Sequence, residues 1–90
     1  MMDAGDLADA DGVRVDARGL RCPLPIIRLA AAARLALPGT VVTVLSTDPA
    51  AEPDIAAWCR MRNAELLRQE WTADESGRFL RSAVRVSPVG

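Results

Sequence analysis

The sequence RGLRCPLP, residues 18–25, marks the point at which a predicted loop ends and a predicted helix begins. It places a cysteine before two prolines, and an alanine-rich apolar run follows. Proline is tolerated in the first turn of a helix because the amides there have no intrahelical partner. We therefore predict that Pro23 is the first helical residue, that Cys22 is the N-cap, and that the Leu24 amide donates to its sulfur.

A thiol at the start of a helix has a chemical consequence. A helix N-terminus favours an anion by roughly 0.3 to 1 kcal/mol, and Arg18 and Arg21 bring further positive charge. A free thiol with a pKa of about 8.5 is only a few per cent thiolate at neutral pH. We therefore expect Cys22 to be exposed, with a moderately lowered pKa. The alternative is a small, unreactive residue packed against the sheet.

Periodic runs on either side of this loop predict a βαβ unit. Residues 13–16 alternate valine with polar side chains, as a short strand does. The helix after the loop would end at Pro38 and Gly39, and its buried stripe would comprise Ile26, Ala30, Ala33 and Leu37. Residues 40–47 are mostly β-branched and uncharged, which is typical of a central strand.

Residues 48–62 predict a second helix with an irregular start. Asp48 and Pro49 are suited to the N-cap and N1 positions, but Pro53 would remove an interior hydrogen bond, so we expect regular helix only from Pro53 onward. One face of this helix would carry Ile55, Trp58, Cys59 and Arg62. Asn63 is suited to a left-handed terminator.

The last part of the chain predicts a β-hairpin. Residues 64–72 and 78–86 would be its strands, joined by the polar turn 73–77. Alternation in the first strand would place Leu67, Gln69 and Trp71 on one face. The open face of the sheet would carry Arg68, Glu70, Arg81 and Arg85, and would be either solvated or a docking surface.

The predicted fold is therefore α+β, a two-layer α/β sandwich in βαβαββ order. Both helices would cover one face of a four-stranded mixed sheet, because each has one apolar stripe to bury. Residues 13–90 would form a single domain, and residues 1–12 a disordered acidic leader.

Composition excludes several classes of function. The chain of 90 residues has no histidine, which excludes a Cys-His hydrolase and leaves no credible metal site. Its net charge is -1; all 11 basic residues are arginine, and outside the leader they face eight acids, a balance of +3. That balance gives no general attraction to nucleic acid.

The same composition favours a cytoplasmic protein, since no secretion signal and no apolar run of membrane-spanning length is present. Cys22 and Cys59 would both be free thiols in that reducing compartment. We expect Cys59 to be a core residue on the second helix and not a resolving partner of Cys22.

The pattern around Cys22 resembles the TusA-like sulfur-carrier proteins. In that family a Cys-Pro-x-Pro motif follows an Asp-x-x-Gly-Leu lead, and the resemblance covers residues 13–86. The matching residues are 15–25, Pro38, Gly39, residues 47–50, Asp54, Ile55, Trp58 and Cys59. Where family members often have a basic residue before the aspartate of the second helix, this chain has Glu52 and Pro53.

The resemblance implies the same two-layer fold and a role for each motif residue. Cys22 would accept a sulfane sulfur as a persulfide and pass it to a partner protein. The supporting motif would comprise Asp16, Gly19, Leu20, Arg21, Pro23 and Pro25, with the prolines fixing the helix start and Gly19 shaping the loop. Arg18, Arg21 and Arg28 would either attract an acidic partner or be solvated surface residues.

The resemblance also implies partners. The sulfur donor would be a cysteine desulfurase or a rhodanese-like protein. The carrier would be a monomer that forms transient complexes and needs no cofactor or metal. It would make no direct contact with nucleic acid or membrane. The pathway is open among tRNA thiolation, molybdenum-cofactor assembly and sulfur oxidation, and so is the handling of selenium.

Two other functions compete with this one. A non-catalytic regulatory module would present the arginine-bearing sheet face to RNA or to an acidic protein, but the chain lacks lysine and an aromatic stacking platform. A thiol redox protein would need a second cysteine near Cys22, and Cys59 lies far outside a Cys-x-x-Cys spacing.

Overall fold

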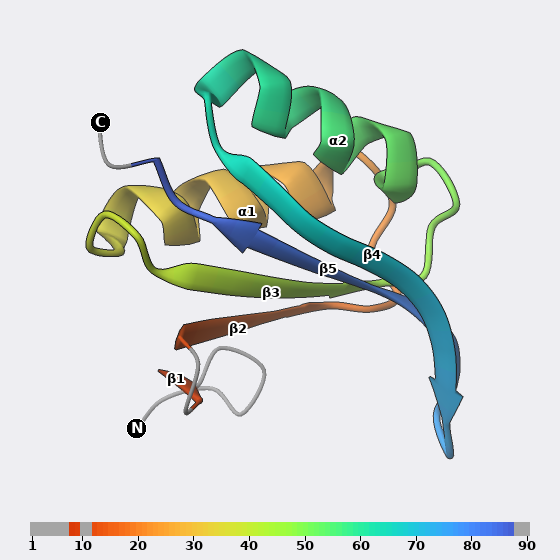
Figure 1. Cartoon of the computed structure of the whole chain (residues 1–90). Coiled ribbons are helices and arrows are strands. Elements are labelled where there is room, and N and C mark those ends of the chain that lie inside the picture. The colour runs from red at the N-terminus through yellow and green to blue at the C-terminus, as the bar shows by residue number, and fades with distance from the viewer. Residues whose placement is uncertain (1–7, 10–11, 88–90) are drawn as a thin grey trace.

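A mixed β-sheet with both helices on one side forms the two layers of the fold (Figure 1). The computed structural model describes residues 8–9 and 12–87. In chain order the elements are β1 (Ala8–Asp9), β2 (Gly12–Ala17), α1 (Leu24–Leu35), β3 (Val41–Ser46), α2 (Ala51–Arg62), β4 (Glu65–Asp74) and β5 (Gly77–Arg85).

The strands lie in the order β1-β2-β3-β5-β4. β2 and β3 are parallel, as the two strands of a βαβ unit must be, and the other pairs are antiparallel. The predicted βαβαββ order and two-layer sandwich are confirmed. The sequence did not predict β1, which pairs with the first residues of β2. Two residues give no periodicity to detect, and the rest of the expected leader before Gly12 lies outside the described residues.

The stripe predicted for α1 is wrong. The helix buries Pro25 and Leu29, with Ile26 and Ala32 packed against the same core. Leu37 lies beyond the end of the helix and is 78% exposed. Four consecutive alanines fit any stripe equally well, so the large Leu29 decides which face turns inward.

Helix α2 begins two residues earlier than predicted. Pro53 falls in its first turn, where a missing amide breaks no helical bond. Ile55 and Cys59 are buried as predicted and Trp58 packs against the core, but Arg62 is exposed. Asn63 ends the helix in the left-handed conformation, with φ of 56°, as predicted.

A β-bulge changes the face assignment in β4. Leu66 lies opposite Val84 but Arg68 lies opposite Ala83, so Leu67 is the extra residue. Leu66, and not Leu67, therefore shares the helix-facing side with Gln69 and Trp71. Both of those side chains donate hydrogen bonds to Glu52 of α2, Gln69 to its carbonyl oxygen at 2.9 Å and Trp71 to Oε1 at 3.1 Å.

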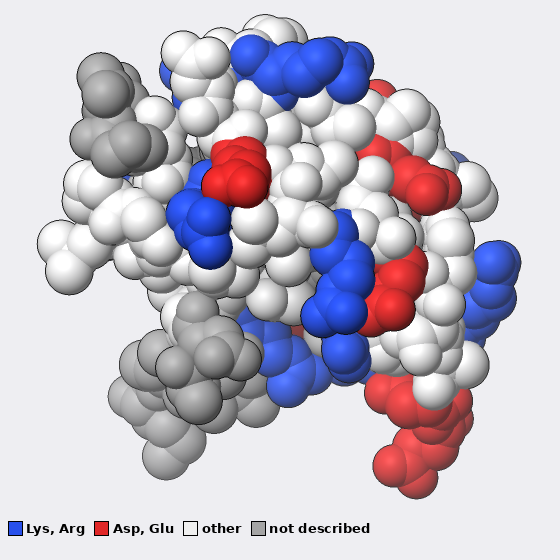
Figure 2. Space-filling model, viewed as in Figure 1, with Lys and Arg blue, Asp and Glu red and all other residues white. Residues whose placement is uncertain are grey.

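The opposite sheet face carries charged side chains, as predicted. Arg68, Glu70, Arg81 and Arg85 are all exposed. In the view of Figure 2, basic and acidic surfaces lie side by side over the middle of the molecule. Among the described residues, no helix has the length and apolar character needed to cross a membrane.

Truncation of Leu29 tests how far the fold depends on this one buried side chain. Leu29 is fully buried, so Leu29→Ala is expected to lower the free energy of unfolding by about 2 to 5 kcal/mol. Leu35→Ala removes the same atoms from a side chain that is 89% exposed in the same helix. This variant should change the free energy of unfolding by less than about 0.5 kcal/mol. Urea denaturation measures both; equal losses would contradict this assignment of the buried face.

Candidate functional site

The site lies in the loop between β2 and α1. Leu20 donates a backbone hydrogen bond to the Ala17 carbonyl at 3.2 Å, which closes a turn. Gly19 has φ of +84°, a conformation that favours glycine, and its amide donates to Thr47 Oγ1 at 2.9 Å. The loop after β2 is thus fastened to the loop after β3.

Asp48 fixes the backbone of Cys22. The Cys22 amide donates to Asp48 Oδ2 at 3.0 Å, and the Ala50 amide donates to Oδ1 at 3.0 Å. These two hydrogen bonds lower the pKa of Asp48, and the charge of Arg21 lowers it further. The predicted N-cap role of Asp48 is wrong, because α2 begins at Ala51 and its N-cap is Ala50. The carboxylate instead closes the turn before the helix and also holds the cysteine, which the sequence did not predict.

The predicted N-cap is displaced by one residue. Helix α1 begins at Leu24 and its cap is Pro23, so Cys22 lies just outside the helix. The Leu24 amide donates to the Arg21 carbonyl at 2.9 Å and not to the cysteine sulfur. The Leu24 amide, which we expected to donate to the thiol, instead closes a tight backbone turn.

The charge around the thiol is also opposite to the predicted one. The pKa of Cys22 is raised to about 11, first by burial, then by hydrogen bonding to the Asp54 carboxylate and by the negative charges of Asp54 and Asp48. The expectation of a lowered pKa is therefore wrong. The side chain is partly buried against the core, and nearby carboxylates outweigh the modest effect of a helix N-terminus.

Arg18 is engaged by residues of the protein itself. Its guanidinium binds both carboxylate oxygens of Asp16, at 2.9 and 2.6 Å, and reaches Asp74 at 3.3 Å and Ser76 at 3.2 Å in the β4–β5 turn. Arg18 lowers the pKa of Asp16, mainly through the hydrogen bonds between their side chains. The pair anchors the Cys22 loop to the hairpin.

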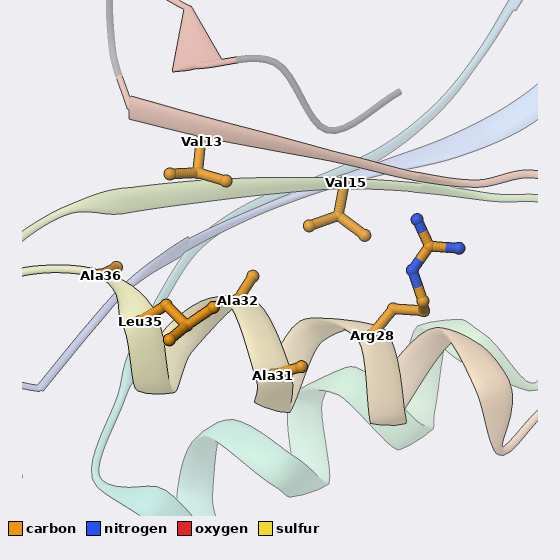
Figure 3. A pocket seen from close by; sticks show the side chains of 7 residues that line it. All are labelled: Val13, Val15, Arg28, Ala31, Ala32, Leu35 and Ala36. Atoms are coloured by element: carbon orange, nitrogen blue, oxygen red, sulfur yellow. The ribbon is translucent and has the colours of Figure 1, made fainter. Parts of the chain in front are cut away.

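The remaining predicted site residues are spread over several environments. Leu20 packs against the core and Pro25 is buried, whereas Arg21 is exposed next to Asp48. Arg28 points from α1 toward β2, at one end of a groove of about 280 Å³ (Figure 3). The groove is lined by Val13, Val15, Arg28, Ala31, Ala32, Leu35 and Ala36.

Asp54 is the site residue that sequence reasoning missed as a neighbour of the thiol. The sequence places it 32 residues from Cys22, and only the packing of α2 beside the loop brings the two together. A signal was present, because Asp48 and Asp54 are the two aspartates at the start of α2. Among the described residues, no group of three metal-binding side chains is assembled.

Removal of the Asp54 charge should activate the thiol. Because this carboxylate stabilises the protonated form, Asp54→Asn should lower the pKa of Cys22 and speed its alkylation at neutral pH roughly three- to tenfold. In the unmodified protein the alkylation rate should rise about tenfold per pH unit until it levels off near pH 11.

The rate of reaction with iodoacetamide as a function of pH measures this shift. Glu65→Gln, which removes a charge at the end of the sheet away from the Cys22 loop, is the matched control and should leave the profile unchanged. An Asp54→Asn profile identical to that of the unmodified protein would show that the carboxylate does not control the thiol.

Comparisons with known proteins identify the family of the chain. The family model described as sulfurtransferase TusA matches residues 13–80, which include the whole loop. The sulfur carrier protein TusA of Pseudomonas putida (strain W619) is 36% identical over 66 residues, covering 73% of this chain and 79% of that protein. The TusA protein of Pseudomonas aeruginosa (strain LESB58) shows the same identity, covering 80% of its length. On this family match and these identities, the chain belongs to the TusA family and is a carrier in a sulfur relay.

Proposed function

We propose that Cys22 is the residue that carries the sulfur, as a persulfide, between two partner proteins. The observation that carries this proposal is the contrast between the two thiols. Cys22 is partly exposed in a loop whose backbone is fixed by Asp48, whereas Cys59 is 2% exposed in the core. Transfer between proteins requires two sulfur atoms to meet, and only Cys22 is accessible for that contact.

Loading is a thiol–disulfide type of exchange. The Cys22 thiolate attacks the outer sulfur of a donor persulfide, a new S–S bond forms on Cys22, and the donor cysteine leaves as a thiolate. The proton lost by Cys22 passes by way of its hydrogen-bonded Asp54 carboxylate to water or to the departing thiolate. In unloading, an acceptor thiolate attacks the outer sulfur and the Cys22 thiolate leaves.

Because the pKa of Cys22 is raised, a partner protein must help to form the reactive thiolate. With a pKa of about 11, only about one Cys22 in ten thousand is a thiolate at pH 7. A partner that places positive charge against Asp54 and Asp48 offsets their effect and increases the thiolate fraction. The free carrier is correspondingly protected from oxidation, because the thiolate is the reactive form.

The resemblance supports a cysteine desulfurase or a rhodanese-like protein as the donor. We propose that the chain acts as a monomer in transient complexes, as a sulfurtransferase in the sense that Cys22 is regenerated in each cycle. Both cysteines are free, which supports the expectation of a reducing, cytoplasmic setting. The acceptor and the pathway, whether tRNA thiolation, molybdenum-cofactor assembly or sulfur oxidation, are left open by these residues.

Intact-mass spectrometry tests the carrier residue. The reduced protein, incubated with a cysteine desulfurase and cysteine or with a sulfane-sulfur donor, should gain the mass of one sulfur atom. Cys22→Ser should abolish the gain because the accepting atom is removed. Cys59→Ser removes a thiol from the core, and this variant should still gain the mass of one sulfur atom.

The cysteine that carries the added sulfur, and the bond that holds it, decide whether Cys22 is the carrier residue. Release of the added mass by a thiol reductant identifies a persulfide. Loading at Cys59 alone, or no loading from either donor, would overturn the assignment of Cys22.

A further inference from the structure

A shallow hollow of about 360 Å³ lies on the sheet face opposite the helices. Its floor includes Leu45 and Phe79, which are 3% and 4% exposed, and arginines from three strands surround it. The lining residues are Arg14 from β2, Thr43 and Leu45 from β3, Arg68 and Asp74 from β4, and Phe79, Arg81 and Ala83 from β5. The fold itself does not require arginine at these positions, which are on the outer side of the sheet.

The hollow has an excess of positive charge. Its single acid, Asp74, already accepts hydrogen bonds from Arg18 and Ser76. Arg68 has only a 3.8 Å contact with Glu70. Within the described part of the chain, Arg14 and Arg81 make no ion pair closer than 4 Å. Several guanidinium groups around a floor that exposes almost no apolar surface are suited to a ligand that presents carboxylates.

This hollow is joined to the Cys22 loop. The Arg18 guanidinium lies 5.1 Å from the centre of the Phe79 ring and also binds Asp74, so one loop residue contacts two residues that line the hollow. A partner that covers the hollow therefore lies beside residues that contact the loop carrying the thiol.

We propose that this hollow docks an acidic segment of a protein that exchanges sulfur with Cys22. The identity of the partner as a sulfur donor or acceptor rests on the proposed function; the preference for an acidic segment rests on the hollow alone. The arginines steer encounter and fix orientation by binding carboxylates of the segment.

Charge and ring placement favour an acidic protein over RNA or a second copy. Glu70 and Asp74 lie between the arginines, so the hollow offers separate guanidinium groups and no continuous basic groove that a phosphate backbone could follow. Phe79, the aromatic residue of the hollow, is buried, so it offers no platform for a base to stack on. Two copies meeting through this face would bring arginine against arginine.

Fluorescence anisotropy with a short labelled peptide that alternates glutamate with serine tests the proposal. The full chain should bind it, with an affinity that falls as salt is added. The double variant Arg14→Gln, Arg81→Gln should bind about tenfold more weakly, because two charge-assisted contacts are lost. Arg60→Gln with Arg62→Gln, the same charge change at exposed positions of α2, should bind as the unmodified protein does.

Three outcomes would overturn the proposal: no peptide binding, equal binding by a peptide with glutamine in place of glutamate, or equal weakening by both double variants. Tighter binding of a single-stranded RNA of equal charge, or a concentration-dependent dimer abolished by the Arg14 and Arg81 changes, would assign the hollow to another occupant. Sulfur loading from an inorganic sulfane donor should be the same in all variants, so failure of the docking proposal is distinguishable from failure of Cys22 as the carrier.

Discussion

The Asp48 carboxylate is the constraint on which the geometry of the site depends. One oxygen accepts the Cys22 amide and the other accepts the Ala50 amide, so a single side chain ties the loop after β2 to the start of α2. The tie is possible because β2 and β3 are parallel and their carboxyl ends meet at the same edge of the sheet. With Gly19 bound to Thr47, the loop is held at two points along this edge. The sulfur position is therefore set by the backbone and not by side-chain packing alone.

The same carboxylate that positions the cysteine also opposes its ionisation. Partial burial raises the pKa of the thiol most, and Asp54 and Asp48 raise it further. This combination separates accurate placement of the thiol from its reactivity. The backbone around Cys22 is held in place, while burial and the two carboxylates keep the thiol protonated.

The two faces of the sheet have separate tasks. The helix-facing side buries Leu29, Ile55, Leu80 and the valines of β2, β3 and β5, and supplies the stability of the domain. The open side carries arginine on several strands around Leu45 and Phe79. Arg18 connects this open side to the site, because it binds Asp16 at the end of β2 and Asp74 in the hairpin.

The sequence by itself determined the order of the elements, the location of the cysteine in the loop before α1, and the family. These features depend on neighbouring residues, since alternation, proline position and a contiguous motif are all local. The tertiary structure alone decided which side of α1 is buried, where β4 bulges, and that Asp54 adjoins Cys22. The run of alanines in α1 fits either buried face equally well, and the bulge in β4 depends on its pairing with β5. The pKa of the thiol was mispredicted because it is raised first by burial in the folded protein and then by carboxylates more than 25 residues away in the sequence, and a local pattern indicates neither.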